Sequence, residues 1–195
     1  MAVKIDLRKA GFEFFSIVVA VVLAMTLTEW RQDYLNKKLA QQSLLNIIEE
    51  VQENRRELME DSAKISQDMA FIDRWLQAQN NASNEDFGVH FSFSFLSKSA
   101  LEVAKINNSL TYLPNEVNMQ IAEVYAAQNF YSDNAIKLFD IMGAMGRAES
   151  KENAEAFADK ARQLRFHLGL IHNTIKAYLG ESQQFLENHR AIPTS

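Results

Sequence analysis

A continuous apolar run dominates the first part of the sequence. Residues 14–28 (FFSIVVAVVLAMTLT) carry no charged side chain. A helix of this length rises about 22 Å, which is less than the roughly 30 Å of a bilayer hydrocarbon core. Extending the helix back to Ala10 brings it to about 28 Å if Glu13, in the first turn, reaches the headgroup layer. The sequence therefore predicts a transmembrane helix over residues 10–28.

Two other interpretations of this run are open from the sequence. Three basic residues precede it, as in the positively charged start of a secretory signal peptide. The residues after Ala24 read MTLTEWRQD, however, and they offer no good pair of small residues for cleavage. The other alternative is a helix buried inside a soluble protein. We favour a retained anchor, with Trp30 and Tyr34 as the interfacial aromatic residues that follow the span.

The charges around the span favour one orientation. Basic residues lie on both sides, so the positive-inside count is nearly equal. A short basic tail before a first span usually stays in the cytoplasm, whereas a long following domain is translocated regardless of its charge. We therefore expect residues 1–9 to form a cytoplasmic tail, residues 30–190 a periplasmic domain, and residues 191–195 a C-terminal tail.

After the span, apolar residues recur every three to four positions, as in a helix that buries one face. No Gly or Pro lies between Gly11 and Gly88, so we expect the anchor to continue into this helix without a break. Arg55 lies on the stripe and is either a polar contact that sets the register, a residue that faces a partner, or a long side chain at the stripe's edge. The stripe comprises Trp30, Tyr34, Lys37, Gln41, Leu44, Ile48, Val51, Arg55, Leu58, Ser62, Ile65, Met69, Ile72 and Leu76.

The middle of the sequence contains a polar loop and an alternating segment. Residues 77–88 (QAQNNASNEDFG) are rich in turn-forming residues. In residues 89–96 (VHFSFSFL), Phe alternates with Ser as in a strand, yet no second strand-like segment exists to pair with it. A lone strand leaves its backbone polar groups unpaired. We expect an extended or irregular segment that lays Phe rings on the bundle, or else the first turn of the next helix.

Start and stop signals divide the remaining chain into helices. Ser99 to Glu102 (SALE) is a capping-box pattern, which predicts a short helix that begins there and ends near Leu110. Pro114 suits the first turn of a third helix, and Ser150 can cap the last helix. The stripes of these two helices are Val117, Ile121, Val124, Gln128, Tyr131, Ala135, Leu138, Met142 and Met145, and then Ala154, Phe157, Ala161, Leu164, Leu168, Ile171, Ile175, Tyr178, Ser182 and Phe185.

These elements predict the fold class. Short connections between amphipathic helices imply antiparallel neighbours, and each helix needs the apolar face of another. The sequence therefore predicts an all-α protein, in which an N-terminal transmembrane helix continues into an antiparallel helical bundle of three long helices and one short one. We expect Gly143 and Gly146 to mark the end of the third helix.

Composition and motif content point away from catalysis. The absence of cysteine excludes disulfides, thiolate metal sites and cysteine nucleophiles. His167 and His172, on one helix, point about 140° apart, so they are poorly placed to share a metal ion. No HExxH or Glu-x-x-His motif occurs. We expect no cofactor, no metal site and no enzyme activity, and a formal charge of −5 gives no general attraction to nucleic acid.

Small residues recur on one face of the predicted span. Ser16, Ala20 and Ala24 lie four positions apart, a spacing that lets another membrane helix approach closely. The same spacing also arises by chance in a Val-rich helix. Glu13 suits either a carboxylate that snorkels to the headgroups or a contact with a partner. We predict Ser16, Ala20, Ala24 and Glu13 as a site of membrane-helix packing.

Several short motifs resemble a known group of proteins. They are Glu13, the run IVVAVVLA, the triplet Glu29-Trp30-Arg31, and residues 101–128 (LEVAKINNSLTYLPNEVNMQIAEVYAAQ). Together they resemble a widespread group of uncharacterised bacterial single-pass membrane proteins, in which a span ending in a polar residue and Trp precedes a helical domain. The resemblance implies a bacterial origin and the same one-span topology, with the chain in the inner membrane. It implies no reaction.

Two functions agree with these features. The first is a non-enzymatic, membrane-anchored accessory or scaffold subunit, whose partners are the bilayer and either other integral membrane subunits or further copies of the chain. The alternative is a periplasmic bundle that senses a ligand. Because residues 1–9 are too few for an output domain, such a sensor would have to signal through the span of a partner.

Overall fold

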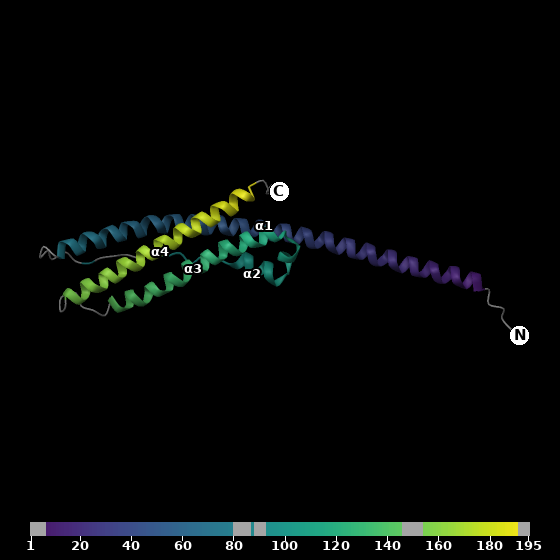
Figure 1. Cartoon of the computed structure of the whole chain (residues 1–195), viewed down its shortest axis with the longest axis horizontal. Coiled ribbons are helices and arrows are strands. Elements are labelled where there is room, and N and C mark those ends of the chain that lie inside the picture. Colours follow the sequence, from purple (N-terminus) through teal and green to yellow (C-terminus); the bar gives the residue numbers. More distant parts are fainter. Residues whose placement is uncertain (1–6, 80–86, 88–92, 146–153, 191–195) are drawn as a thin grey trace.

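The chain is helical through most of the residues that its computed structural model describes, which are 7–79, 87, 93–145 and 154–190. The described elements, in order, are α1 (Leu7–Gln79), α2 (Ser99–Ile106), the 3-10 turn η1 (Ser109–Tyr112), α3 (Asn115–Met145) and α4 (Ala154–Asn188) (Figure 1). No strand occurs among the described residues. The predicted all-α fold of three long helices and one short one is confirmed.

Helix α1 is unbroken from the predicted span into the bundle, as the absence of Gly and Pro indicated. Its 73 residues extend about 110 Å at 1.5 Å per residue. The first part stands alone at one end of the molecule (Figure 1). The bundle first meets it where Asn36 Nδ2 donates to the Tyr112 hydroxyl at 2.7 Å, and Ala40 is the first buried side chain among those described. The part before these residues includes the one described helical stretch that is long and apolar enough to cross a membrane.

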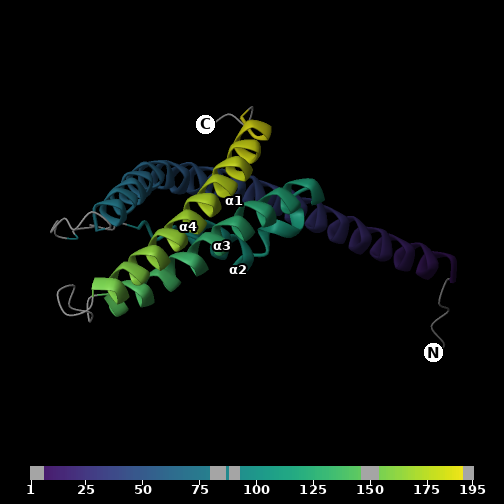
Figure 2. The ribbon, with the colours of Figure 1, turned by 60° about the vertical axis from the view of Figure 1, so that its left-hand side comes forward.

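The long helices pack on one another through α4. Both α1 and α3 lie along α4, and Figure 2 shows α4 lying obliquely across α1. Residue numbers rise on α1 as they fall on α4 across their contacts, so these two helices are antiparallel, whereas α1 and α3 run in the same direction. The pairs that show this are Arg55–Ser182, Ser62–His172 and Asp73–Arg165, and then Glu50–Tyr125 and Asn54–Gln128.

The buried positions confirm the predicted stripes of α3 and α4. Every stripe residue from Ile121 to Leu138 and from Phe157 to Phe185 is buried. On α1 one of the two predicted rows of buried positions is correct and the other is wrong. Leu44, Val51, Leu58, Ile65 and Ile72 are buried, but the second row of core positions lies one residue earlier than expected, at Ile47, Asn54, Asp61 and Trp75. Two of these four residues are polar, which is why the apolar pattern placed the row at Ile48, Arg55, Ser62 and Leu76.

The start of the short helix differs from the predicted capping box. Lys98 is the N-cap residue and makes no side-chain cap, and Glu102 pairs with Lys105 at 2.8 Å instead of folding back. The cap comes from another helix, because Glu50 Oε2 on α1 accepts the N–H of Ala100 at 2.9 Å. The capping box was therefore wrong because a carboxylate distant in the sequence was already in place.

The rest of the connection shows where short elements end. Helix α2 ends at Ile106 and not near Leu110, since Asn108 adopts a left-handed conformation (φ 55°) that separates it from η1. Pro114 immediately precedes α3, and its carbonyl accepts the N–H of Asn118 at 3.1 Å. The predicted stop at Gly146 and the cap at Ser150 lie outside the described residues.

The described part of the alternating Phe/Ser segment is confirmed as irregular chain, because residues 93–98 form neither helix nor strand. Its described rings pack on α3, where Phe93 and Phe95 lie 6.2 Å and 6.3 Å from the ring centre of Phe139. Phe91 lies outside the described residues. This segment lies between α1 and α3, so its backbone N–H and C=O groups need hydrogen-bond partners on these two helices.

Candidate functional site

The predicted packing face of the span is open to its surroundings. Ser16, Ala20 and Ala24 are all exposed on one side of α1, and the side chain of Glu13 is not among those described. Leu35 lies eleven positions after Ala24, about three helical turns, so it lies on the same side. It is 46% exposed, and Leu39, one turn further, is 41% exposed. Leu35 and Leu39 are therefore uncovered on the side of α1 that carries the small residues, with Thr28 and Arg31 between them and Ala24.

The predicted interfacial residues are also exposed. Trp30 and Tyr34 are 70% and 63% exposed, and both precede the first contact between α1 and the bundle. An aromatic ring with one polar end suits the boundary between hydrocarbon and water. These two residues therefore stand where an interfacial anchor would be needed.

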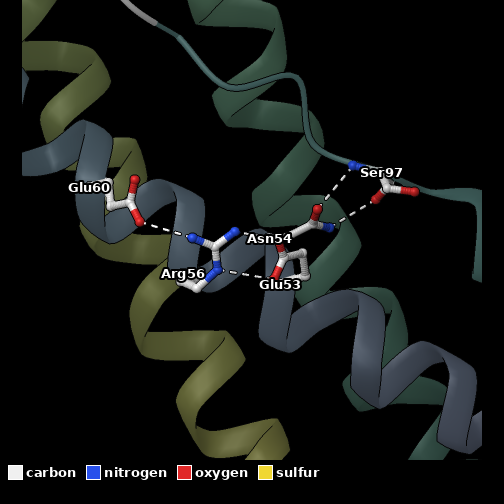
Figure 3. Close-up of polar contacts among 5 residues, drawn as sticks. All are labelled: Glu53, Asn54, Arg56, Glu60 and Ser97. Carbon is white, nitrogen blue, oxygen red and sulfur yellow. Dashed lines mark hydrogen bonds and ion pairs between the residues drawn. The ribbon is translucent and has the colours of Figure 1, made fainter.

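A buried polar network holds the 93–98 segment, and the sequence interpretation missed it. Asn54, only 2% exposed, donates from Nδ2 to the Ser97 carbonyl at 2.8 Å and accepts the Ser97 N–H at Oδ1 at 2.9 Å (Figure 3). Gln128 Nε2 donates to the same carbonyl at 2.8 Å. Two buried amides thus replace the neighbouring strand that the extended segment lacks.

A second part of this network lies about two helical turns further along α1. Asp61, 1% exposed, accepts the Ser94 N–H at 2.7 Å, and the Tyr131 hydroxyl donates to the Ser94 carbonyl at 3.2 Å. Asn54 and Asp61 follow Ile47 at intervals of seven residues. That heptad spacing is the signal by which the sequence could have shown them to be core positions.

Glu50 connects three parts of the fold. Its Oε1 accepts the hydroxyl of Tyr125 on α3, and its Oε2 accepts both the Ser97 hydroxyl at 2.7 Å and the Ala100 N–H at 2.9 Å. Burial and this carboxylate raise the pKa of Tyr125 well above its ordinary value. Burial likewise raises the pKa values of Tyr131 and Tyr178. These phenols stay protonated at neutral pH, and the hydroxyls of Tyr125 and Tyr131 donate hydrogen bonds to Glu50 and to the Ser94 carbonyl.

Arg55 faces α4, which settles its three sequence interpretations in favour of a contact within the bundle. It donates to the Leu179 carbonyl, to Ser182 Oγ at 3.2 Å and to Gln183 Oε1 at 3.1 Å. A guanidinium that binds three groups on one neighbouring helix helps to fix the register of the two helices.

An acidic groove runs beside this network on the outer side of α1. Its volume is about 470 Å³, and it is lined by Glu49, Glu50, Glu53 and Glu57 on one side and by Phe95 and Val103 on the other. Arg56 on the same face pairs with Glu53 and, at 2.9 Å, with Glu60 (Figure 3). Arg56 lowers the pKa of Glu53.

The three described histidines lie apart from one another, and each has a local partner. His167 and His189 each bind a backbone carbonyl of their own helix, at 2.9 Å and 2.7 Å, and His172 lies 3.4 Å from Ser62 Oγ. His90 lies outside the described residues. Across the part of the chain that the structure describes, no cluster of His, Asp or Glu is suited to a metal ion.

His172 gives the stability of the bundle a dependence on pH. Burial, with Lys176 beside it, lowers the pKa of His172 below 6.5, so the folded state binds this proton less readily than the unfolded chain. The contribution of neutral His172 is complete above pH 6.5 and is lost as the pH falls through the lower folded pKa. Between about pH 7 and pH 5, thermal melts should show a larger loss of stability for the unsubstituted chain than for His172→Gln. Equal losses would show that His172 takes no part.

Comparison with known proteins adds no assignment to these features. No protein family, no curated protein sequence and no solved structure matches the chain.

Proposed function

We infer that the protein is a non-enzymatic accessory or scaffold subunit, anchored by residues 10–28 in a bacterial inner membrane with its bundle in the periplasm. The observation that carries this proposal is the exposed face of α1. The small residues of the predicted span and, beyond Thr28 and Arg31, Leu35 and Leu39 are uncovered on one side of an unbroken helix. Lipid covers such a face in the membrane, but exposed Leu35 and Leu39 beyond it call for a protein neighbour.

The bundle supports the same proposal through what its polar groups do. Asn54, Asp61, Gln128 and Glu50 are engaged with backbone or hydroxyl groups of the chain itself. Their hydrogen bonds organise the fold and leave no convergent acid, base and nucleophile among the described residues. A rigid body on a membrane anchor is suited to holding other proteins in place.

The proposal is tested by adding bulk to the packing face. Ala20→Leu keeps the span apolar but separates helices that approach closely at this position. We expect it to reduce the amount of each co-purifying membrane protein, or of a second copy of the chain, by about tenfold after extraction in mild detergent. The measurement is quantitative mass spectrometry of the purified complex, together with its size.

Val19→Leu provides the matched control, because it adds bulk to the same span about 100° away around the helix. It should leave the complex unchanged, and membrane insertion and helicity should survive both changes. If both variants keep every partner in equal amounts and the same size, the Ser16, Ala20 and Ala24 face is ordinary lipid-facing surface. If the chain purifies without any stoichiometric partner, the scaffold proposal itself fails.

A further inference from the structure

We propose that the acidic groove beside α1 binds a basic amphipathic segment of a partner protein. This inference rests on the proposed function, because it names the chemistry of the partner that a scaffold would hold. The groove lies between the outer face of α1 and the stretch from Phe95 to Val103, and its volume is about 470 Å³. It therefore has the size of a site for several side chains of a peptide.

The apolar side of the groove is unusually exposed. Phe95 is 80% exposed although its ring stacks on Phe139, and Val103 on α2 is 53% exposed. Ile106 follows Val103 on the outer side of α2 and is 82% exposed. Large apolar side chains gathered beside a groove are typical of an interface, because water around them is released when a partner covers them.

The opposite side of the groove carries an excess of negative charge. Glu50 is held by Tyr125 and by the start of α2, and Glu53 is paired with Arg56. Glu49 and Glu57 have no hydrogen bond or ion pair in the described structure. A Lys or Arg of a partner would pair with these two carboxylates, while the partner's apolar residues would contact Phe95 and Val103.

The position of the groove argues against lipid headgroups and the chain's own N-terminal tail as its occupants. Its residues 46–57 lie about 27–44 Å along α1 from Thr28, the end of the predicted span, which is too far for lipid headgroups. The chain's own basic residues at positions 4, 8 and 9 precede the span, so the bilayer separates them from the groove. Nucleic acid is repelled by the same glutamates. The negative charge and the exposed apolar side chains together favour a basic amphipathic segment of another protein as the occupant.

The test measures binding of a defined peptide to the full chain in phosphatidylcholine nanodiscs. The probe is a fluorescein-labelled helical peptide of Lys and Leu, and binding is followed by fluorescence anisotropy with empty nanodiscs subtracted. Two comparison peptides replace every Leu by Ser or every Lys by Glu. We expect the Lys/Leu peptide to bind, the Lys/Ser peptide to bind about tenfold more weakly, and the Glu/Leu peptide not to bind.

Groove variants should weaken the binding of the Lys/Leu peptide. Glu49→Gln combined with Glu57→Gln should raise its Kd by about five- to tenfold at low salt and by less at high salt. Phe95→Ser should raise it by about tenfold through lost apolar contact. The matched controls are Glu123→Gln with Glu181→Gln, which removes two exposed carboxylates on α3 and α4, and Phe166→Ser, which removes an exposed ring on α4. These should leave Kd unchanged.

The proposal is overturned if the control variants weaken binding as much as the groove variants, if the groove variants bind normally, or if the Glu/Leu peptide binds equally well. A change in the size of the peptide-free particle caused by groove variants would identify a second copy as the occupant, and it would equally overturn the proposal. The two proposals fail separately. Loss of every co-purifying partner with retained peptide binding rejects the scaffold role, whereas a partner held without peptide binding rejects the groove.

Discussion

Without residues 1–28, all of the shortened chain is expected to be found in the soluble fraction and none in the membrane fraction. The intact chain should resist high-salt and alkaline washing, because an apolar span holds a protein far more strongly than charge attraction at a membrane surface. The shortened chain should remain strongly helical, since the first described buried side chain is Ala40. Immunoblots of the washed fractions and far-ultraviolet circular dichroism check both expectations.

Deletion of residues 1–9 alone provides the control for this experiment. It removes the basic tail but keeps residues 10–28, so the chain should still resist the alkaline wash, even if its orientation changes. Recovery of the intact chain as a soluble protein would contradict the anchor. So would a chain without residues 1–28 that still sediments with the membranes after the wash.

The second large effect is expected from Asn54→Ala. The change removes the hydrogen bonds of the buried side chain to both backbone groups of Ser97 and leaves the part-buried Ser97 N–H without its partner. A buried polar group left unpaired costs about 1–3 kcal/mol, so the combined loss should be about 3 kcal/mol. That corresponds to a fall in melting temperature of about 6–12 °C for a chain of this size. Thermal melts of the full chain in detergent, followed by circular dichroism, measure it.

Asn46→Ala is the matched control for this change. Asn46 also lies on α1, but it is exposed and accepts a hydrogen bond only from Gln42, at 3.0 Å. Its replacement should change the stability by less than about 0.5 kcal/mol. Adding Gln128→Ala to Asn54→Ala should cost less than the sum of the two single changes, because both amides bind the Ser97 carbonyl. Strict additivity, or equal effects of Asn54→Ala and Asn46→Ala, would show that the network does not hold the 93–98 segment.

The sequence predicts the buried face of a helix well where the buried residues are also the apolar ones. In α4 every stripe residue from Phe157 to Phe185 is buried, and eight of those nine positions carry apolar or aromatic side chains. In α1 the two properties separate at Asn54 and Asp61, which are buried because they serve the backbone of a distant segment. A pattern of apolar residues cannot detect a core position whose side chain is chosen for hydrogen bonding.

The two candidate sites also differ in how far the sequence alone predicts them. The exposed small residues of the span depend only on helix geometry, so their spacing was enough to place Ser16, Ala20 and Ala24 on one face. The groove depends on tertiary structure, because Phe95 and Val103 are distant from the glutamates of α1 in the sequence and lie beside them only in the folded chain. The run of glutamates was visible in the sequence, but nothing local distinguished Glu50, which caps α2, from Glu49, which is exposed.

The unbroken course of α1 also has a mechanical consequence. With no Gly or Pro between residue 28 and Gln79, the helix has no sequence-encoded hinge, and a change in the tilt of residues 10–28, which we propose to lie in a bilayer, would be passed to the part of α1 that follows them. That part is about 76 Å long, so a rotation of roughly 10° in the membrane sweeps its far end sideways by about 13 Å. In the proposed membrane-anchored state, a small adjustment to bilayer thickness, or to a neighbouring helix, would thereby be amplified into a displacement as wide as a helix.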